Sequence, residues 1–527
     1  MFFYTKQSLC AAIVGMALVA PAAQAETTIR YMGLSKLDML DPIWTTNYGV
    51  RDHGYLIYDT LFAQDAEGNI KPQMIDTWTV SEDRMAYRFS LRDGLMFHDG
   101  APVTSQDVVA SLERWMHKDT FGVEIKNRLS SMDVVDDKIF TLSLTEPFGL
   151  VVDAFGKTAS NVPFIMPARI ASGAVDDQIS DPVGSGPFKF ILDDWQPGVK
   201  AVYEKFEAYV PRDEAPSGLA GGKVAMVDRI ERVFFPDDIT AVNALATGEI
   251  DYIPQFQPDL IPILSGASDV VVQPHNPLGQ TIQIIPNFLQ PPTDDVRIRQ
   301  AMQLALGQED YMTAILGSYD ELYSYCPSIF MCGTALENDA NSERQMSQDV
   351  EAAKALLAEA GYDGTPLTLL HATDVSDQRT GGSVTAQRLR EAGFVVDDVV
   401  SDWATIAQRR ANKAPIAEGG WNIFQTGWDG MALQSPLTNV YVSGACDDAW
   451  YGWNCSETLQ RLKQDYINAT SVDEQKTIGE AMQQEAYEIV SVIMMGQYTQ
   501  ASAWSANLEG MRQATVTTNL WGVSKAE

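Results

Sequence analysis

Two separate regions of this 527-residue chain alternate strand-type and helix-type patterns, and this alternation limits the fold more than any other feature. In residues 228–254, a strand-type segment precedes a predicted helix from about Asp238 to Thr247 and a second strand that contains Asp251. Helix-type and strand-type segments alternate again from residue 296 to residue 430. The repetition predicts an α/β fold of two lobes, each built around a mixed or parallel sheet.

The first 25 residues have the pattern of a cleavable secretory signal, with one lysine, an apolar run and the small-residue ending Ala23-Gln24-Ala25. Cys10 lies within the apolar run without the small residues that precede a lipoprotein cysteine, so we expect a mature chain without a lipid anchor that begins near Glu26. No later segment has the roughly 18 uninterrupted apolar residues that a membrane helix needs. These patterns predict a soluble, exported protein in the periplasm.

The formal net charge of −33 is strongly acidic. Nucleic acid is excluded as a partner, because a phosphate backbone requires clustered lysine and arginine side chains. The charge is interpreted as a solvated acidic surface, and a bias toward cationic or amine-bearing ligands is the alternative.

Four cysteines follow the predicted signal, and they form two local pairs, Cys326 with Cys332 and Cys446 with Cys455. In an oxidising compartment this proximity predicts two short-loop disulfides, each worth roughly 2–3 kcal/mol. Zinc binding is the weaker alternative, because neither pair has C-x2-C spacing or an accompanying histidine.

The segment FHDG raises the question of catalytic or metal chemistry, because His98 directly precedes Asp99. It follows a predicted hairpin over residues 76–92. Asp99 and the next glycine suit a tight turn, and Thr104 with Asp107 forms a capping-box pattern that begins a helix. His98 is therefore interpreted as a turn or packing residue. The mature histidines are scattered along the chain and predict no metal site: His53, His98, His117, His275 and His371.

Motifs for catalysis or cofactor binding are missing from the sequence. The segment GSGPFKF fails as a nucleotide loop, because Lys189 occupies the place of the third glycine and the segment leads into a strand. The chain has no G-x-S-x-G or H-E-x-x-H motif. We therefore predict no catalytic residues and no cofactor, with a secreted hydrolase as the disfavoured alternative. The acidic pairs lie beside predicted strands or turns, where solvated edges are expected: Asp136-Asp137, Asp193-Asp194 and Asp397-Asp398.

The stretch KPQMIDTWTVSEDRMAYRFSLRDGLMFHDGAPVTSQDVVASLERW, residues 71–115, resembles the signature region of the extracytoplasmic solute-binding proteins of ABC importers, the peptide/nickel/opine class (family 5). The similarity continues in order through GSGPFKF, ALATGEIDYI, VRIRQAMQLALG and AKALLAEAGY, and it covers most of the mature chain. It departs at Met74 and Ile75, where Pro-x-Leu-Ala is usual, and at GSGPF, where GTGPF is common. The motifs are weak alone and specific together, and they make FHDG a scaffold turn.

This resemblance implies the two-lobed type II fold of periplasmic binding proteins with an extra domain (cluster C-like), in which the lobes close on a ligand. The expected division is a signal peptide (1–25), lobe I (26–70, 185–285 and 500–527), an extra domain of lobe I (71–184) and lobe II (286–499).

The resemblance also implies where the ligand binds. In peptide-binding relatives, a Gly-Trp-x-Gly-Asp stretch at the end of a strand presents its aspartate to the amino terminus of the ligand. In this chain the stretch is TGWDGMALQS, where the tryptophan is Trp428 and the expected aspartate falls on Met431. We expect Trp428 to line the cleft. Asp429 is the carboxylate left there, and it either binds an ammonium group or only caps the following loop.

Three other segments offer candidate contacts. The loop TTNYGVR is expected to approach the cleft from lobe I, so that Asn47 and Tyr48 either bind the ligand or lie in a surface loop. Trp403 matches a family position near the edge of the cleft and is either core or contact. The loop between Cys446 and Cys455 is either a rim of the cleft or ordinary packing, and its aromatic residues are Trp450, Tyr451 and Trp453.

These observations predict a monomeric periplasmic receptor that captures a peptide or a similar small polar solute. It would deliver the solute to an ABC permease and ATPase complex in the inner membrane. Because the amine-binding motif is altered, a non-peptide solute such as an opine, a saccharide or a metal chelate is an alternative. A sensory or chaperone role of the same fold is another.

Overall fold

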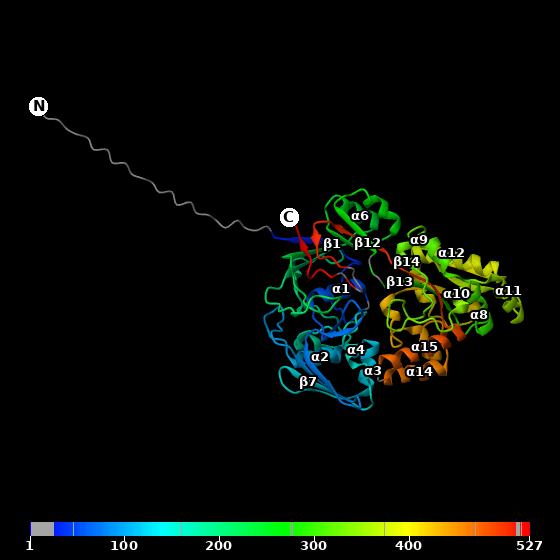
Figure 1. Ribbon diagram of the computed structural model, residues 1–527, viewed down its shortest axis with the longest axis horizontal. Helices are drawn as coiled ribbons and strands as arrows, with labels where there is room; N and C mark the ends of the chain where they lie inside the picture. The colour runs from blue at the N-terminus through cyan, green and yellow to red at the C-terminus, as the bar shows by residue number, and fades with distance from the viewer. Residues whose placement is uncertain are drawn as a thin grey trace.

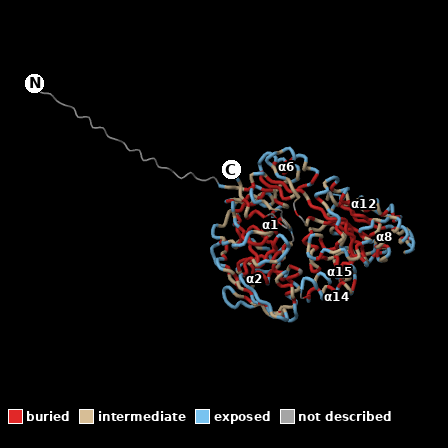
Figure 2. Tube along the Cα trace, in the orientation of Figure 1, coloured by how far each residue is buried: buried red, intermediate tan, exposed pale blue. Residues whose placement is uncertain are grey.

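The computed structural model shows two lobes side by side, with the blue to green segments as far as α6 (Asp238–Ala246) and the red C-terminal end in one lobe, and the chain from α8 (Val296–Ala305) to α15 (Val472–Ile489) in the other (Figure 1). In Figure 2 buried segments fill the middle of each lobe and exposed loops surround them. No described helix is long and apolar enough to cross a membrane. The predicted signal peptide, its cleavage at Ala25 and His275 lie outside the described residues. Besides Met1, the structure describes residues 26–45, 47–159, 161–274, 276, 278–373, 375–469, 471–512, 517 and 519–526.

A seven-stranded sheet in the order β12-β19-β11-β1-β10-β9-β8 forms the centre of the first lobe. β1 pairs in parallel with β10 and β11, whereas β9 and β19 are antiparallel to their neighbours, so the sheet is mixed as predicted. The predicted helix between β10 and β11 is α6 (Asp238–Ala246). The strands are β1 (Thr28–Met32), β8 (Phe188–Phe190), β9 (Lys200–Lys205), β10 (Arg229–Val233), β11 (Tyr252–Phe256), β12 (Val270–Pro274) and β19 (Ala501–Ser505).

The second lobe is built around a six-stranded sheet in the order β14-β18-β13-β17-β15-β16. Because side chains alternate along a strand, Ile282 and Ile284 of β13 enter a core that they share with α8, α9, α11 and α12. Ile285 enters the core on the other face with Tyr487 of α15. The strands are β13 (Gln280–Pro286), β14 (Tyr323–Ser324), β15 (Leu367–Ala372), β16 (Val396–Ser401), β17 (Ile423–Asp429) and β18 (Ile493–Tyr498). The helices are α8 (Val296–Ala305), α9 (Gln308–Leu316), α11 (Val350–Glu359), α12 (Ser376–Glu391), α14 (Glu457–Asn468) and α15 (Val472–Ile489).

A separate four-stranded antiparallel sheet, β4-β5-β7-β6, lies in the part of the chain expected to form the extra domain. The predicted hairpin is β4 and β5, and α2 packs its apolar side chains into the same core. Thr104 and Asp107 form the predicted capping box of α2. The elements are β4 (Ile75–Val80), β5 (Ala86–Leu91), β6 (Leu129–Val134), β7 (Ile139–Leu144), α2 (Ser105–Trp115), α3 (Thr120–Arg128) and α4 (Val151–Phe155).

His98 joins two of the sequence motifs. Its Nε2 lies 3.1 Å from the carbonyl oxygen of Gly186, and the amide of Gly184 donates to its Nδ1 at 3.3 Å. Burial lowers the pKa of this imidazole to about 4. His98 therefore fastens the FHDG turn to the GSGPF segment, which agrees with its interpretation as a packing residue.

The chain passes from one large sheet to the other between β12 and β13 and returns between β18 and β19. β13 begins at Gln280 and pairs with β17 and β18, so the first passage precedes the expected boundary at residue 285. The sequence did not predict this passage correctly, because the strands that pair with β13 come much later in the chain. The remaining division into lobes and an extra domain stays a prediction.

Both predicted disulfides are present, Cys326–Cys332 and Cys446–Cys455. The remaining short elements are α1 (Tyr48–Ile57), α5 (Ala168–Ala171), α7 (Ile261–Leu264), α10 (Glu343–Ser347), α13 (Trp403–Arg409), β2 (Phe62–Gln64), β3 (Ile70–Pro72), β20 (Leu508–Glu509) and β21 (Ser524–Lys525).

Candidate functional site

A cavity of about 490 Å³ lies between the two lobes. Its lining comes from the start of α1 and the end of β11 in the first lobe, and from the end of β17 and the start of α12 in the second. The two passages between the sheets complete it. The side chains with polar groups that line the cavity are Ser35, Asn47, Tyr48, Arg51, Gln255, Asn276, Gln280, Asp377, Gln378, Trp428, Asp429, Thr499 and Gln500.

The first-lobe wall is organised by Asn47, which is the N-cap of α1. Its Oδ1 accepts hydrogen bonds from the amide of Gly49 at 2.8 Å and from the hydroxyl of Ser35 at 2.8 Å. A Cβ atom at Gly49 would lie 2.1 Å from the Ser35 hydroxyl oxygen and 2.6 Å from Nη2 of Arg232, so this position has no room for a side chain. The cap thereby places both predicted residues, Asn47 and Tyr48, at the cavity.

Arg51, one helical turn after Asn47, is a lining residue that the sequence analysis missed. Its guanidinium lies 4.4 Å from the centre of the Tyr48 ring and pairs with Asp52 at 3.3 Å. Both members of this pair are only 3% exposed. The helical spacing from Asn47 was the available signal, since residues three and four apart share one face of a helix.

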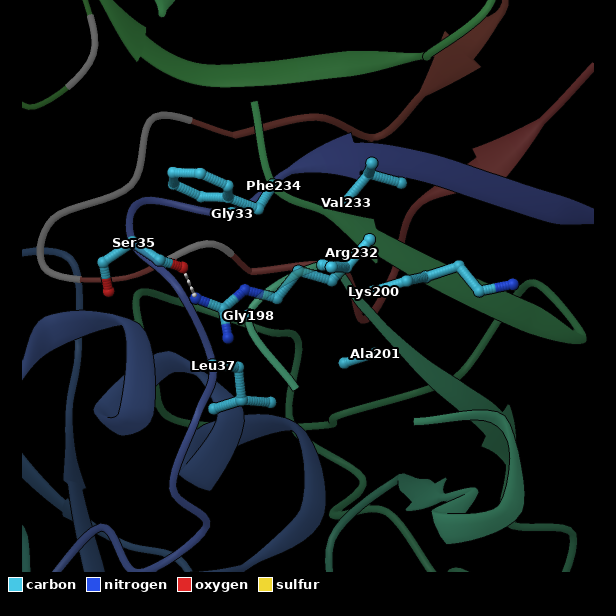
Figure 3. Close-up of a pocket in the computed structure, with 10 residues that line it drawn as sticks. Gly33, Ser35, Leu37, Gly198, Lys200, Ala201, Arg232, Val233 and Phe234 are labelled. Carbon is cyan, nitrogen blue, oxygen red and sulfur yellow. Dashed lines mark hydrogen bonds between the residues drawn. The ribbon is translucent and has the colours of Figure 1, made fainter. Parts of the chain in front are cut away.

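A second, very small cavity adjoins this wall at Ser35 (Figure 3). Figure 3 shows the Arg232 side chain directed at the backbone oxygen of Ser35, to which Nη2 donates at 2.9 Å. The volume is about 10 Å³, which is at most enough for one water molecule. We therefore regard it as a packing gap beneath the first-lobe wall.

The second-lobe wall contains Trp428 and Asp429 at the end of β17. The Oδ1 atom of Asp429 accepts a hydrogen bond from the amide of Met431 at 3.0 Å, so Asp429 caps the following 3-10 turn (Gly430–Leu433). Burial raises the pKa of the Asp429 carboxyl above its ordinary value, and the positive charge of Arg51 opposes this rise. Asp429 therefore caps the loop and also lines the cavity, whereas its binding of an ammonium group stays a prediction.

The start of α12 contributes Asp377 and Gln378, which the sequence analysis also missed. The hydroxyl of Tyr498 donates to Oδ2 of Asp377 at 2.6 Å, and the amide of Gln378 donates to Oδ1 at 2.8 Å. Both residues follow the carboxyl end of β15. That end of an α/β strand is where ligands commonly bind, and this was the signal that could have identified them.

Trp403 does not line the cavity. Its ring centre lies 5.2 Å from the guanidinium of Arg410, which also lies over Trp450 at 5.3 Å and over Tyr451 at 4.7 Å. Trp450 in turn contacts the ring of Trp428, with 5.6 Å between the ring centres. The disulfide-bonded aromatic loop therefore packs behind the second-lobe wall, and a ligand contact by Trp403 stays a prediction.

A metal site has no support in the described part of the chain, where no group of three His, Cys, Asp or Glu side chains is placed to hold an ion. The cavity instead combines carboxylates, an arginine, amides and aromatic rings. These groups suit an organic solute with charged and hydrogen-bonding groups.

Known proteins resemble this chain in sequence along most of its length. The family model for bacterial extracellular solute-binding proteins, family 5 (middle) matches residues 69–450. A relative from Sinorhizobium fredii (strain NBRC 101917 / NGR234), the probable peptide ABC transporter periplasmic-binding protein y4tO, is 35% identical over 508 residues, which are 96% of this chain and 94% of the relative. The periplasmic oligopeptide-binding protein OppA of Escherichia coli (strain K12) is 26% identical over 79% of this chain and 81% of OppA.

Solved structures show the same fold. The substrate-binding protein CtaP from Listeria monocytogenes has a TM-score of 0.79 at 21% identity and covers 95% of this chain and 100% of CtaP. The protein AgaA from A. tumefaciens R10, solved with agropinic acid, has a TM-score of 0.75 at 23% identity and covers 95% of this chain and 99% of AgaA. The predicted two-lobed α/β fold is confirmed.

Proposed function

The chain belongs to the bacterial extracellular solute-binding proteins of family 5, and from this membership we propose that it is the peptide receptor of an ABC importer. Family membership makes it a solute-binding receptor and not a member of an enzyme family. The peptide class is supported by the relative from Sinorhizobium fredii, whose name describes a probable peptide transporter component. The cavity volume of about 490 Å³ is within the range of small-ligand sites.

The observation that carries the proposal is the meeting of groups from both lobes at one cavity. Asn47, Tyr48 and Arg51 face it from the first lobe, and Trp428 and Asp429 face it from the second. A peptide offers an amine, a carboxylate and amide groups, which complement this set of acceptors, donors and rings. We propose that closure of the lobes around the peptide brings the two walls together.

A non-peptide solute is the second candidate, because Met431 occupies the place of the peptide-binding aspartate. Met431 is 3% exposed and belongs to the core, so it offers no group to an amine. An opine, a saccharide or a metal chelate would need no such aspartate. The structural neighbour AgaA, solved with agropinic acid, shares the fold.

We further propose that the chain is exported, that its signal is cleaved near Ala25, and that the mature chain acts as a periplasmic monomer without enzymatic activity. It would deliver its ligand to an ABC permease and ATPase complex in the inner membrane. Unchanged masses of bound ligands after prolonged incubation would support the absence of turnover, and a hydrolysed peptide would contradict it.

The test is a thermal-shift screen of the mature chain, from Glu26, against di- and tripeptides, opines, sugars and nickel–histidine. A specific ligand at 100 times its Kd adds roughly 2.7 kcal/mol of stability, which raises the melting temperature measurably. We expect peptides to produce the shift and Asp429→Asn to reduce it strongly. Asp237→Asn is the matched control, because Asp237 also caps a helix through its side chain but lies outside the cavity. A shift with opines, sugars or the nickel chelate and none with peptides would favour the second candidate.

A further inference from the structure

The charges around the cavity are not balanced. Three charged side chains line it, namely Arg51, Asp377 and Asp429. The positive charge of Arg51 acts on two carboxylates, namely the buried Asp52, with which it pairs, and Asp429. Among the described residues, neither Asp377 nor Asp429 forms an ion pair. The single positive charge of Arg51 does not balance Asp52, Asp377 and Asp429, so an excess of negative charge remains to be compensated by whatever occupies the cavity.

Two unpaired acceptor atoms at the cavity, in Gln378 and Gln500, also suit a ligand that brings hydrogen-bond donors. Gln378 is 7% exposed and lines the cavity, and its side-chain oxygen has no donor within the described chain. The side-chain oxygen of Gln500, another lining residue, is also buried and without a donor there. A buried acceptor without a partner costs roughly 1–3 kcal/mol. A ligand that brings N–H donors would remove this cost.

The carboxylates lie on one wall and are held in place. Asp377 is fixed by the Tyr498 hydroxyl and Asp429 by the amide of Met431. An oxygen of Asp377 lies 4.0 Å from the position a Cβ atom would take at Gly427, two residues before Asp429 on β17. Asp377, Gln378 and Asp429 all line the second-lobe side of the cavity and offer hydrogen-bond acceptors, and we call these three residues the acceptor wall.

We infer that the acceptor wall is a subsite for a cationic group and that the receptor selects ligands with a net positive charge. On the proposed function, from which this inference takes its ligand class, the ligand is a peptide with a lysine or arginine side chain. Charge-assisted hydrogen bonds from an ammonium or guanidinium group would satisfy both the carboxylates and the amide oxygen. The net charge of −33 would also attract such a ligand over a distance, so that association slows as salt is added.

The experiment is calorimetric titration of the mature chain with the tripeptides Ala-Lys-Ala, Ala-Arg-Ala, Ala-norleucine-Ala and Ala-Glu-Ala. Norleucine matches the length of lysine and has no charge. We expect the lysine and arginine peptides to bind about tenfold more tightly than the norleucine peptide, which corresponds to about 1.4 kcal/mol. We expect the glutamate peptide to bind most weakly. Equal affinity across the series would overturn the inference and leave the proposed function intact.

Two variants locate the effect. Asp377→Asn is expected to bring the ratio of lysine to norleucine affinity toward one. Gln378→Glu adds a carboxylate to the acceptor wall without removing a contact of Asp377, and it is expected to raise the ratio. Asp397→Asn is the control, because it removes the same charge from an exposed position on β16 of the same lobe. An identical ratio in Gln378→Glu and the unmodified chain would count against the acceptor wall.

The peptide-receptor function and the acceptor wall can be overturned independently of each other. If none of the peptides binds, spermidine and agmatine are compared with glycerol and glucose by thermal shift. A shift with the cationic amines alone supports the acceptor wall and overturns the peptide receptor. No shift with any cation overturns both.

Discussion

At the scale of single residues, His53 shows how burial beneath the first-lobe wall keeps a titratable side chain uncharged. The imidazole is fully buried, its Nδ1 lies 3.0 Å from the Tyr203 hydroxyl, and its edge contacts the Phe190 ring. Burial, assisted by the positive charge of Arg232, lowers the pKa of His53 to about 3. The ring is therefore neutral in the folded protein across the physiological range.

The lowered pKa of His53 predicts that the stability of the fold depends on pH. The unfolded chain binds a proton at His53 near pH 6.5, and the folded chain does so only near pH 3. Stability should therefore fall as the pH is lowered from about 6.5 toward 3, with a contribution from this residue of about 1.4 kcal/mol per pH unit at full slope.

Urea unfolding at pH 7.5, 6 and 5 measures this contribution. His53→Gln should reduce the slope of unfolding free energy against pH by about one proton in the acid range. His117→Gln, which removes an exposed histidine, is the control. The same slope in all three proteins would show that His53 does not titrate in this way.

Residues differ in how well the sequence predicts their place in the site. Trp428 and Asp429 could be placed because the family resemblance puts their motif at the end of a strand beside the cleft. Asn47 could be placed because its loop follows the first strand, from which the resembling fold brings it to the cleft. Asp377 and Gln378 lie at the same cavity only because β15 and β17 are neighbours in the sheet. That neighbourhood depends on pairing across the fold, and a linear sequence does not state it.

At the scale of elements, the same distinction separates local from distant interactions. The hairpin of β4 and β5, the helix α6 and the capping box of α2 depend on residues close in the chain, and all three were predicted. The sheet to which β13 belongs is decided by its pairing with β17 and β18. The expected lobe boundary at residue 285 instead left most of β13 in lobe I. Local hydrogen bonds and periodicity define elements, whereas non-local pairing defines their partners.

The loop closed by Cys446 and Cys455 packs against the ligand site through the contact of Trp450 with Trp428. Replacing both cysteines with serine should lower the free energy of unfolding by roughly 2–3 kcal/mol, because the unfolded chain gains freedom. Since Trp450 of this loop supports Trp428, ligand affinity should fall as well.

Urea unfolding and calorimetric titration measure these two effects. The Cys326→Ser/Cys332→Ser double variant is the control, because its loop is also closed by a disulfide but has no aromatic ring against Trp428. Comparable losses of ligand affinity in both double variants would contradict a specific supporting role for Trp450.

At the scale of the whole molecule, the lobes also meet away from the two passages between the sheets. Arg84, in the turn between β4 and β5, donates a hydrogen bond from Nη1 to the carbonyl oxygen of Ala469 at 2.6 Å, just after α14. The side-chain amide of Gln64 donates to Gln434 at 3.4 Å across the same gap. These contacts join the two lobes directly, so we expect them to favour a closed arrangement of the lobes.

Arg84→Ala should therefore favour the open arrangement. We expect a larger radius of gyration in small-angle X-ray scattering and ligand affinity lower by about two- to tenfold, because the hydrogen bond to Ala469, worth about 0.5–1.5 kcal/mol, is lost. Arg88→Ala, at an exposed position of β5 in the same hairpin, is the control. An unchanged radius and affinity in Arg84→Ala would show that the contact does not influence closure.

The two passages between the sheets also have a thermodynamic consequence. Asn276 in one passage and Thr499 in the other line the cavity, and the amide of Asn276 donates to the Thr499 hydroxyl at 3.1 Å. The segments that connect the two sheets thus also line the cavity, and on the proposed closure they are both the hinge and the floor of the ligand site. Apparent affinity equals intrinsic affinity multiplied by the fraction of binding-competent molecules, so a substitution on this floor that alters closure rescales the affinity for every ligand alike. Discrimination between ligands is then a property of the walls, and the two quantities can change independently when the receptor adapts to a new solute.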